Sequence, residues 1–285
     1  MPGESPDMID YDSYPHTRLE PYGKRLQRVF QRLRGRGGEK RQKVYLVDLG
    51  DRRLKRVVFE HAASAEQVGE CLQAFQGLRI FPDFVQQQGR DLWVEFVEGR
   101  LVTSLDSEVI TDLARIFTTL YSRDAVLRPV AEGPWLADVE RDLRALREAG
   151  VLNESLHQRL RERLKEWTPE AVWIGYDYSD PRPANLLRCG DGSYRFIDVE
   201  SLVREQLLGT GVAKACFRWF GERRQEFFAH ESWRSAPLAD ASAPVLDEAF
   251  DFVELACLAS WTCRSIALKK PLVRPELFEG LANRG

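Results

Sequence analysis

Three polar residues with distinctive spacing stand out in the segment AVWIGYDYSDPRPANLLRCGDGSYRFIDVE, residues 171–200. Asp180 is followed by Asn185 five residues later, and Asp198 comes thirteen residues after the asparagine. Carboxylate and amide oxygens are the ligands that Mg²⁺ takes, usually beside the phosphates of a substrate. A carboxylate can also accept or orient the proton of a hydroxyl group. If the three residues converge, they could therefore serve the transfer of a phosphoryl group.

The elements around these residues determine whether they can converge. The apolar run at 171–175 predicts a buried strand, and SYRFIDVE predicts another strand after a Gly-Asp-Gly turn. Asp180 then follows one strand, Asn185 follows a short loop, and Asp198 lies on the next strand of a hairpin. Asp and Asn near proline also favour ordinary turns, so the first two residues alone fit a structural loop as well. Asp198 and an apolar strand upstream, WVEFVEG, favour a shared site.

The rest of the chain predicts an α+β protein with two unequal parts. Before residue 98 the pattern indicates strands around a turn at 49–51, a helix of about 13 residues capped by Ser64, and two further strands. Long amphipathic helices are predicted at 107–121 and 135–167, and the chain from Leu202 onward is predicted to be mainly helical. A small β-rich part, 1–98, thus precedes a larger helical part, 99–285.

The pair YSDPRPANLL and YRFIDVE resembles the two motifs of the aminoglycoside phosphotransferase and choline kinase group of the protein-kinase-like fold. The first of these motifs is HGD-x-x-x-x-N, and the second is a hydrophobic residue followed by Ile-Asp-x-Glu. Both spacings match, and the resemblance extends over roughly residues 30 to 205. It implies a two-lobed fold with a small β-rich N-lobe, a larger helical C-lobe and a nucleotide site between them.

The resemblance also implies an activity and roles at the site. We expect a kinase that uses ATP and Mg²⁺ to phosphorylate a hydroxyl of a small molecule such as a sugar, an amino alcohol or an aminoglycoside-like compound. Asp180 would orient or deprotonate the acceptor, and Arg182 would add a catalytic cation near the phosphates. Asn185 and Asp198 would bind magnesium. The identity of the acceptor and the choice of ATP over GTP leave no trace in the sequence.

The resemblance assigns the phosphate contacts of the N-lobe less directly. The strand RRLKRVVFEH contains no unambiguous Val-x-Lys motif. Lys55 alternates with Val57 and Phe59 and is the first candidate for the lysine that grips ATP, with Arg56 the second. Its acidic partner would be Glu66 or Glu70 on the next helix. Glu66 could equally interact with the dipole of that helix from its first turn.

Two further segments match the nucleotide-binding features of the group. Gly35 and Gly37 lie in RGRGG, where the phosphate-covering loop would fall, although this run also fits a simple turn. The segment from Trp93 to Gly99 resembles the hinge between the lobes. There the backbone around Glu95 and Val97 would meet adenine.

Departures from the family pattern leave alternatives open. Tyr178 stands where the group has histidine, two residues before the catalytic aspartate. The group also carries a downstream Gly-Asp-Pro and Asp-Leu-Ala segment that braces the catalytic loop, whereas this chain reads SLVREQLLGTGVAKACF. A catalytically weak or inactive kinase-like protein with a regulatory or scaffolding role is therefore one alternative. A kinase for lipopolysaccharide core sugars is another.

The composition indicates the class of protein, its cellular location and its possible partners. The chain has 285 residues, 44% hydrophobic and 30% charged, with a net charge of −3, which is typical of a globular protein. Five cysteines without a CxxC pair predict reduced thiols and a cytoplasmic location. Residues 24–36 predict a basic amphipathic helix that either packs on the domain or meets an anionic membrane or glycolipid surface. Nucleic acid is not expected as a partner, because aromatic residues do not alternate with the basic ones.

Overall fold

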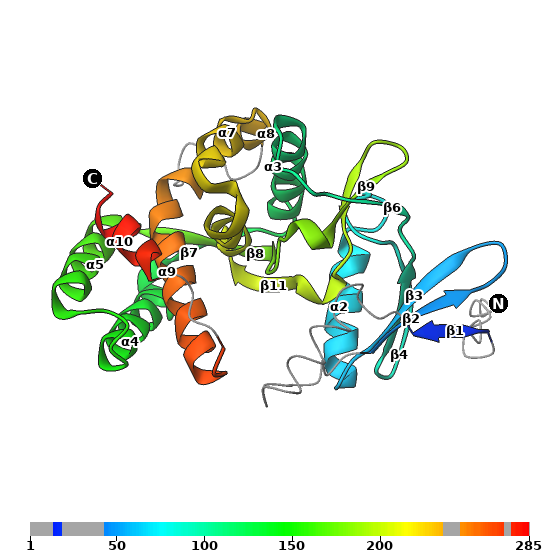
Figure 1. Cartoon of the computed structure of the whole chain (residues 1–285), viewed down its shortest axis with the longest axis horizontal. Coiled ribbons are helices and arrows are strands. Elements are labelled where there is room, and N and C mark those ends of the chain that lie inside the picture. Colours follow the sequence, from blue (N-terminus) through cyan, green and yellow to red (C-terminus); the bar gives the residue numbers. More distant parts are fainter. Residues whose placement is uncertain (1–13, 19–42, 236–245, 271–274, 285) are drawn as a thin grey trace, which may run out of the picture. The chain divides into compact units, whose positions relative to one another are not determined.

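The computed structural model describes residues 14–18, 43–235, 246–270 and 275–284 (Figure 1). The chain divides into two compact units, Met1–Glu98 and Gly99–Gly285, and each is described by itself. The predicted basic helix at 24–36 lies outside the described residues, as do Gly35 and Gly37.

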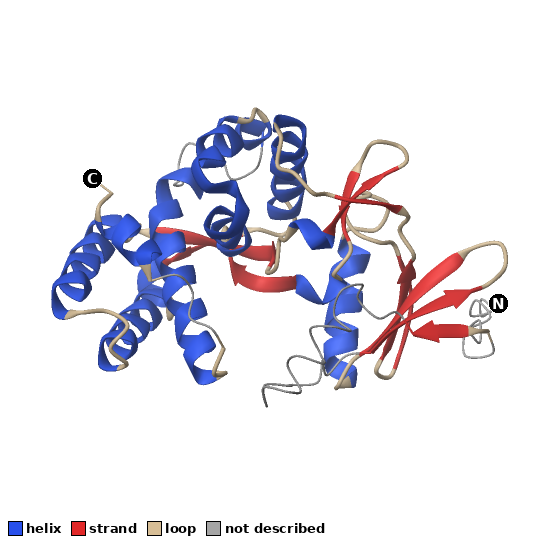
Figure 2. Cartoon of the chain, viewed as in Figure 1, coloured by secondary structure: helices blue, strands red, loops and turns tan. Residues whose placement is uncertain are grey.

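The first unit contains a five-stranded antiparallel sheet and one described helix (Figure 2). The strand order is β1-β2-β3-β5-β4. Gly50 makes the turn between β2 and β3 with a φ of +89°, a conformation that residues with a side chain rarely adopt. The elements are β1 (His16–Arg18), β2 (Lys43–Asp48), β3 (Arg53–Val58), α2 (Ala62–Ala74), β4 (Phe84–Gln88) and β5 (Asp91–Glu95).

The two faces of this sheet bury different side chains, because residues alternate along a strand. Leu54 and Trp93 form a buried apolar cluster with Val47 on one face. Helix α2 covers the opposite face. A Cβ added to Gly69 of this helix would lie 3.2 Å from the Phe84 ring. The missing side chain at Gly69 therefore allows α2 to approach the sheet closely.

Helices predominate in the second unit (Figure 2). A π-helical turn at Cys216–Phe220 continues α6. The α-helices are α3 (Ser107–Tyr121), α4 (Trp135–Glu148), α5 (Glu154–Trp167), α6 (Thr210–Ala215), α7 (Arg224–Ala229), α8 (Ser232–Ser235), α9 (Leu246–Ala267) and α10 (Glu276–Ala282). Short 3-10 turns lie at Val130–Glu132, Pro183–Asn185, Val199–Ser201 and Gly221–Arg223.

Two small antiparallel sheets complete the second unit, with orders β10-β9-β6 and β11-β8-β7. Strand β8 is central in one sheet and β9 in the other, so the loop 179–185 links the two sheets. Asp180 and Asn185 both lie on this loop. The strands are β6 (Gly99–Leu101), β7 (Val126–Pro129), β8 (Ala171–Tyr178), β9 (Leu186–Cys189), β10 (Tyr194–Phe196) and β11 (Leu202–Leu207).

Helix α3 anchors the core of the second unit. Its N-cap residue Asp106 accepts a hydrogen bond from the Val109 N–H at 2.9 Å, which satisfies a donor left open at the helix start. The ring of Phe117 is fully buried, with its centroid 6.0 Å from that of Phe196 and 6.1 Å from that of Phe227. The helix, the β9–β10 hairpin and α7 thus share one aromatic core.

The helix predicted at 107–121 is confirmed, whereas the segment 135–167, predicted as a long helix, forms the two helices α4 and α5. Another prediction is wrong: helix α2 begins at Ala62 after His61, so Ser64 lies within its first turn and is not its cap. The chain from Leu202 is mainly helical, as predicted, but it begins with strand β11. Its pairing partner β8 is distant in sequence, which is why the local pattern did not reveal the strand.

Candidate functional site

The β9–β10 hairpin brings Asn185 and Asp198 together. Leu186 pairs with Phe196, and the Ile197 N–H donates to the Asn185 carbonyl at 2.9 Å, so the residues that flank the hairpin stay in register. The Asn185 Nδ2 lies 3.4 Å from the Asp198 Oδ2. The spacing of thirteen residues noted in the sequence is thus set by this hairpin, which lies between Asn185 and Asp198.

Asn185 also ties Asp180 into the same site. Its Nδ2 donates to the Asp180 main-chain carbonyl at 2.9 Å. The structure therefore brings together all three residues of the sequence motif. Both side-chain hydrogen bonds of Asn185 with the described residues run through Nδ2, so its amide oxygen accepts none from them and could bind a metal ion.

Two arginines hold the Asp180 carboxylate, whose side chain is 17% exposed. The Arg182 Nε donates to Oδ2 at 2.7 Å, and Arg218 donates to Oδ1. The Arg218 guanidinium also lies over the Trp261 ring, 4.4 Å from its centroid. Arg182 also donates to Oδ2 through Nη2, whereas Oδ1 accepts only from Arg218 among the described residues and keeps a lone pair. Asp180 can therefore still accept a hydrogen bond from a hydroxyl group while both arginines stay bound.

Tyr178 occupies the position that the resemblance gives to histidine. Its ring is fully buried and stacks on Phe196, with centroids 4.0 Å apart and planes 20° apart. Burial raises the pKa of the Tyr178 hydroxyl well above its usual value, and the nearby carboxylates of Asp198, Asp180 and Glu200 raise it further. Tyr178 is consequently neutral, and it packs the start of the loop 179–185 onto the hairpin.

Asp177 braces the loop from the other side. Its Oδ1 accepts hydrogen bonds from the Tyr121 hydroxyl at 2.9 Å and the Tyr178 N–H at 2.7 Å. Its Oδ2 accepts from the Gly211 N–H of α6 at 2.8 Å. Burial raises the pKa of the Asp177 carboxyl to about 6, and these three hydrogen bonds and Lys214 oppose that rise. A carboxylate inside the strand thus fixes the start of α6 beside the loop.

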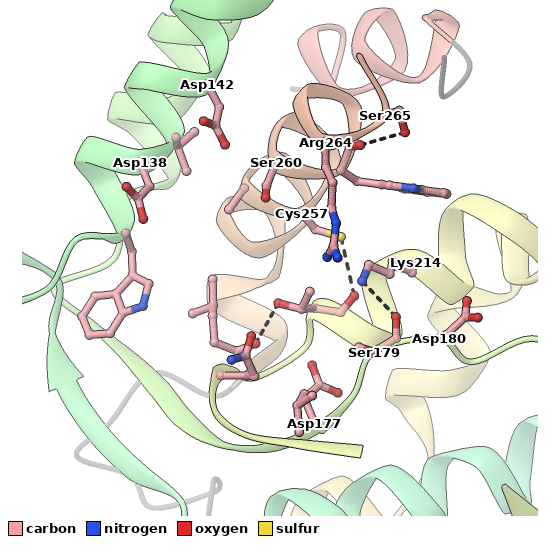
Figure 3. A pocket seen from close by; sticks show the side chains of 18 of the residues that line it. Asp138, Asp142, Asp177, Ser179, Asp180, Lys214, Cys257, Ser260, Arg264 and Ser265 are labelled. Carbon is pink, nitrogen blue, oxygen red and sulfur yellow. Dashed lines mark hydrogen bonds between the residues drawn. The ribbon is translucent and has the colours of Figure 1, made fainter. Parts of the chain in front are cut away.

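A cavity of about 670 Å³ opens beside Asp180 within the second unit. Figure 3 shows side chains of α4, α6 and α9 directed toward it. Its lining includes Ser179, Asp180, Arg182, Lys214, Arg218, Trp261 and Arg264. An acceptor molecule bound there would lie next to the Asp180 carboxylate.

The donor set fits magnesium held together with a substrate. Asn185 supplies an amide oxygen and Asp198 a carboxylate, both of which are hard oxygen ligands. Among the described residues there is no cluster of three or more His, Cys, Asp or Glu side chains that could hold a metal ion. The remaining ligands of a magnesium ion would therefore be phosphate oxygens and water, as is usual for this ion.

In the first unit, Lys55 and Arg56 are neighbours on strand β3, so their side chains lie on opposite faces of the sheet. Lys55 pairs in register with Val94 and lies on the sheet face that α2 covers. Arg56 lies on the opposite face, where it pairs with Asp91 at 2.9 Å and stacks 5.2 Å from the Trp93 centroid. Arg56 thus has an acidic and an aromatic partner within the sheet.

The acidic and hinge candidates also lie in the first unit. Glu66 is exposed on α2 and has no hydrogen bond or ion pair with the described residues. The Glu95 carboxylate accepts from the Asp83 N–H at 3.2 Å. Val97 is buried, yet its backbone N–H and C=O have no hydrogen bond with the described residues. Those backbone groups are of the kind that can pair with a nucleobase.

The structure of the chain, but not its sequence, is similar to known proteins. No family model and no curated protein matches the sequence. A macrolide 2'-phosphotransferase type I matches the structure with a TM-score of 0.58 and 14% identity, over 93% of this chain and 97% of that one. A choline kinase from Streptococcus pneumoniae matches with 0.52 and 13%, over 91% and 100% of the two chains. An aminoglycoside phosphotransferase from Alicyclobacillus acidocaldarius matches with 0.51 and 16%, over 86% and 85%.

These matches confirm the predicted fold class. The chain has the two-lobed α+β kinase-like fold of the macrolide and aminoglycoside phosphotransferases and the choline kinases, with a small β-rich part and a larger helical part. No helix among the described residues is long and apolar enough to cross a membrane.

The sequence did not reveal the cations of the cavity or the structural role of the buried Asp177. Lys214 and Arg218 come from α6 and the π-helical turn that continues it, and Arg264 comes from α9. Neither segment carries a motif, and only the fold brings these cations beside Asp180. Asp177 did carry a signal, since an acid within an apolar strand must find donors when it is buried. Its partner Gly211, in the short segment GTG, was the companion signal.

Proposed function

We propose that the protein is a kinase that transfers the γ-phosphoryl group of ATP to a hydroxyl of a small molecule, with Mg²⁺ as cofactor. The convergence of Asp180, Asn185 and Asp198 on one loop and hairpin is the observation that carries this proposal. The fold adds support, because the similar structures are phosphotransferases and kinases. The cytoplasmic location stays a prediction.

The residues of the loop have distinct roles in the reaction. The acceptor oxygen bonds to the γ-phosphorus while the bond from that phosphorus to the bridging oxygen breaks, which leaves ADP. Asp180 orients the acceptor hydroxyl and receives its proton. Arg182 and Arg218 fix the carboxylate and add positive charge near the transferred group.

Asn185 and Asp198 hold magnesium, which supplies charge neutralisation for the phosphates when it is bound. Lys55 contacts the α- and β-phosphates, with Glu66 as its acidic partner, and the backbone from Glu95 to Val97 receives adenine. Gly35 and Gly37 belong to the loop proposed to cover the phosphates.

Nucleotide binding tests the proposal directly. Thermal unfolding is measured with ATP, with and without Mg²⁺, for the intact protein and for Asp198→Asn. Ligand at about 100 times its Kd adds about 2.7 kcal/mol of stability if it binds only the folded state. We expect a magnesium-dependent shift that Asp198→Asn abolishes. No shift at millimolar ATP would contradict the proposal and favour a kinase-like protein that binds a regulatory partner.

A further inference from the structure

Both acidic and basic side chains line the cavity beside Asp180, but more of the acids than of the cations have partners within the protein. The lining cations are Arg141, Arg182, Lys214, Arg218, Arg264 and Lys270. The lining acids are Asp138, Asp142, Asp177, Asp180 and Glu205. A substrate would meet only those charges that the protein has not already paired.

The acids are largely committed to partners inside the protein. Arg141 pairs with Asp138 at 2.5 Å and with Asp142 at 3.1 Å. Asp180 is held by two arginines, and Asp177 accepts three hydrogen bonds. Among the acids of this lining, Glu205 alone has neither an ion pair nor a side-chain hydrogen bond with the described residues, and it is exposed.

Three of the cations have no such partner. Lys214, Arg264 and Lys270 make no ion pair with a carboxylate of the described residues. The Lys214 Nζ donates to the Ser179 carbonyl at 2.9 Å, which places its charge one residue from Asp180 and leaves two of its three N–H donors. Figure 3 shows Lys214 of α6 and Arg264 of α9 directed into the cavity.

The pairing of these charges also disfavours a cationic acceptor. A quaternary ammonium or a protonated amine is bound by an open aromatic face or by unpaired carboxylates. Arg218 already covers the Trp261 ring. Trp135 of α4 also lines the cavity, but Arg141 pairs with the nearby acids of that helix, Asp138 and Asp142. Glu205 is then the one unpaired acid of the lining, against three cations without an ion pair among the described residues.

We propose that the acceptor is a hydroxyl compound that carries an anionic group, a carboxylate or a phosphate, and that Lys214, Arg264 and Lys270 bind this group. The inference rests on the proposed kinase function and specifies its substrate class. Choline, ethanolamine and aminoglycosides are cations at neutral pH, so this chain would differ in acceptor charge from the substrates named for several of the structures it resembles.

Equilibrium binding to the full chain without nucleotide tests this inference independently of catalysis. The probes are gluconate, glucose 6-phosphate, glucose, glucosamine and choline, followed by ligand-observed NMR. We expect gluconate or glucose 6-phosphate to bind at least about tenfold more tightly than the neutral and cationic probes. Which of the two anions binds better distinguishes a carboxylate acceptor from a phosphate acceptor.

Variants then locate the site. Arg264→Gln and Lys270→Gln should each weaken anion binding about tenfold, with Arg264→Lys losing less. Lys269→Gln is the matched control, because Lys269 is exposed next to Lys270 but does not line the cavity.

Several binding results would contradict an anionic acceptor. Equal or tighter binding of glucosamine, choline or glucose overturns it, as does no anion binding at about 10 mM. Loss of anion binding in Lys269→Gln but not in the cavity variants overturns it as well. Failure of the kinase proposal is distinct, since that would appear as absent magnesium-dependent ATP binding whatever the result with the anions.

Discussion

At the scale of single residues, Asp180 is the group on which the proposed chemistry depends most. Two arginines fix both of its carboxylate oxygens, so its orientation toward the cavity is set before any acceptor arrives. Such prior orientation lowers the entropy that the reaction must lose. The Asp180 side chain is therefore expected to contribute to turnover far more than to ATP binding.

The substitution Asp180→Asn tests this expectation. Asparagine keeps the size of the side chain but cannot accept the hydroxyl proton, so kcat should fall by about 10²- to 10⁴-fold. The magnesium-dependent thermal shift with ATP should persist, because Asn185 and Asp198 remain. A variant with unchanged kcat would exclude Asp180 as the base. Loss of ATP binding would assign the residue to the metal site instead.

Asp177 makes a residue-scale prediction about stability and pH. Burial raises its pKa from 3.8 to about 6 in the folded protein, so the folded state binds more protons than the unfolded state between these values. Stability from this group is therefore complete below pH 3.8 and lost as pH rises through about 6. The shift of about two pKa units corresponds to about 3 kcal/mol.

Urea unfolding of the intact protein and of Asp177→Asn from about pH 4 to 7 measures this contribution. Asparagine does not titrate, so the unfolding free energy of the intact protein should fall relative to that of the variant across this range. Parallel curves for the two proteins would show that Asp177 titrates alike in both states and would contradict the prediction.

At the scale of elements, the fit of α6 against strand β8 positions the loop 179–185, which carries Asp180. The Gly211 N–H reaches Asp177 because glycine has no side chain there. A Cβ at Gly211 would lie 2.2 Å from the Tyr178 carbonyl oxygen and 2.7 Å from the Asp177 Oδ1. Both neighbours belong to the strand that leads into Asp180. The helix and the loop therefore cannot separate without disturbing the site.

The substitution Gly211→Ala should consequently destabilise the protein by about 1–3 kcal/mol or more, as overpacking does in a closely packed core. The control is Gly280→Ala in α10, where an added Cβ has no neighbour within 4 Å. Alanine favours helix by about 1 kcal/mol over glycine, so the control should be neutral or more stable. Chemical denaturation compares the two variants, and equal effects would exclude the proposed close fit.

At the scale of the whole molecule, the sequence predicted those helices, strands and loops that are determined by residues close together along the chain. The spacing from Asp180 through Asn185 to Asp198 reflects one loop and one hairpin, and the apolar period of 107–121 defines one helix. Local patterns suffice in both cases. They do not suffice for β11, whose partner strand is distant, or for the cavity.

Long-range packing explains what the sequence did not reveal at the site. Arg218 reaches Asp180 only because α6 continues into a π-helical turn, and Trp261 lies under its guanidinium only because α9 packs against α6. No motif marks either residue. Single charged residues on helices are normally solvated, so their convergence in a cavity becomes visible only in the folded chain.

Near the C-terminal end, Arg284 forms an ion pair with the buried Glu254 carboxylate of the second unit. The Glu254 carboxylate of α9 is 1% exposed, and Arg224 and Arg284 both bind it. Arg284 also pairs with Asp251 at 2.8 Å. A buried carboxylate that loses one of its cations must pay a desolvation cost that is no longer offset. The end of the chain therefore contributes to the stability of the unit that holds the cavity.

The substitution Arg284→Ala should lower the unfolding free energy by about 1–3 kcal/mol, because Arg224 remains to offset part of the Glu254 charge. Arg147→Ala is the matched control, since Arg147 forms an exposed pair with Glu154 at 3.6 Å. Exposed pairs contribute about 0–1 kcal/mol, so the control should change little. Urea unfolding followed by tryptophan fluorescence compares the two. Equal losses would show that the buried carboxylate gains nothing from its second arginine, and that the chain end is not needed to hold α7 and α9 together.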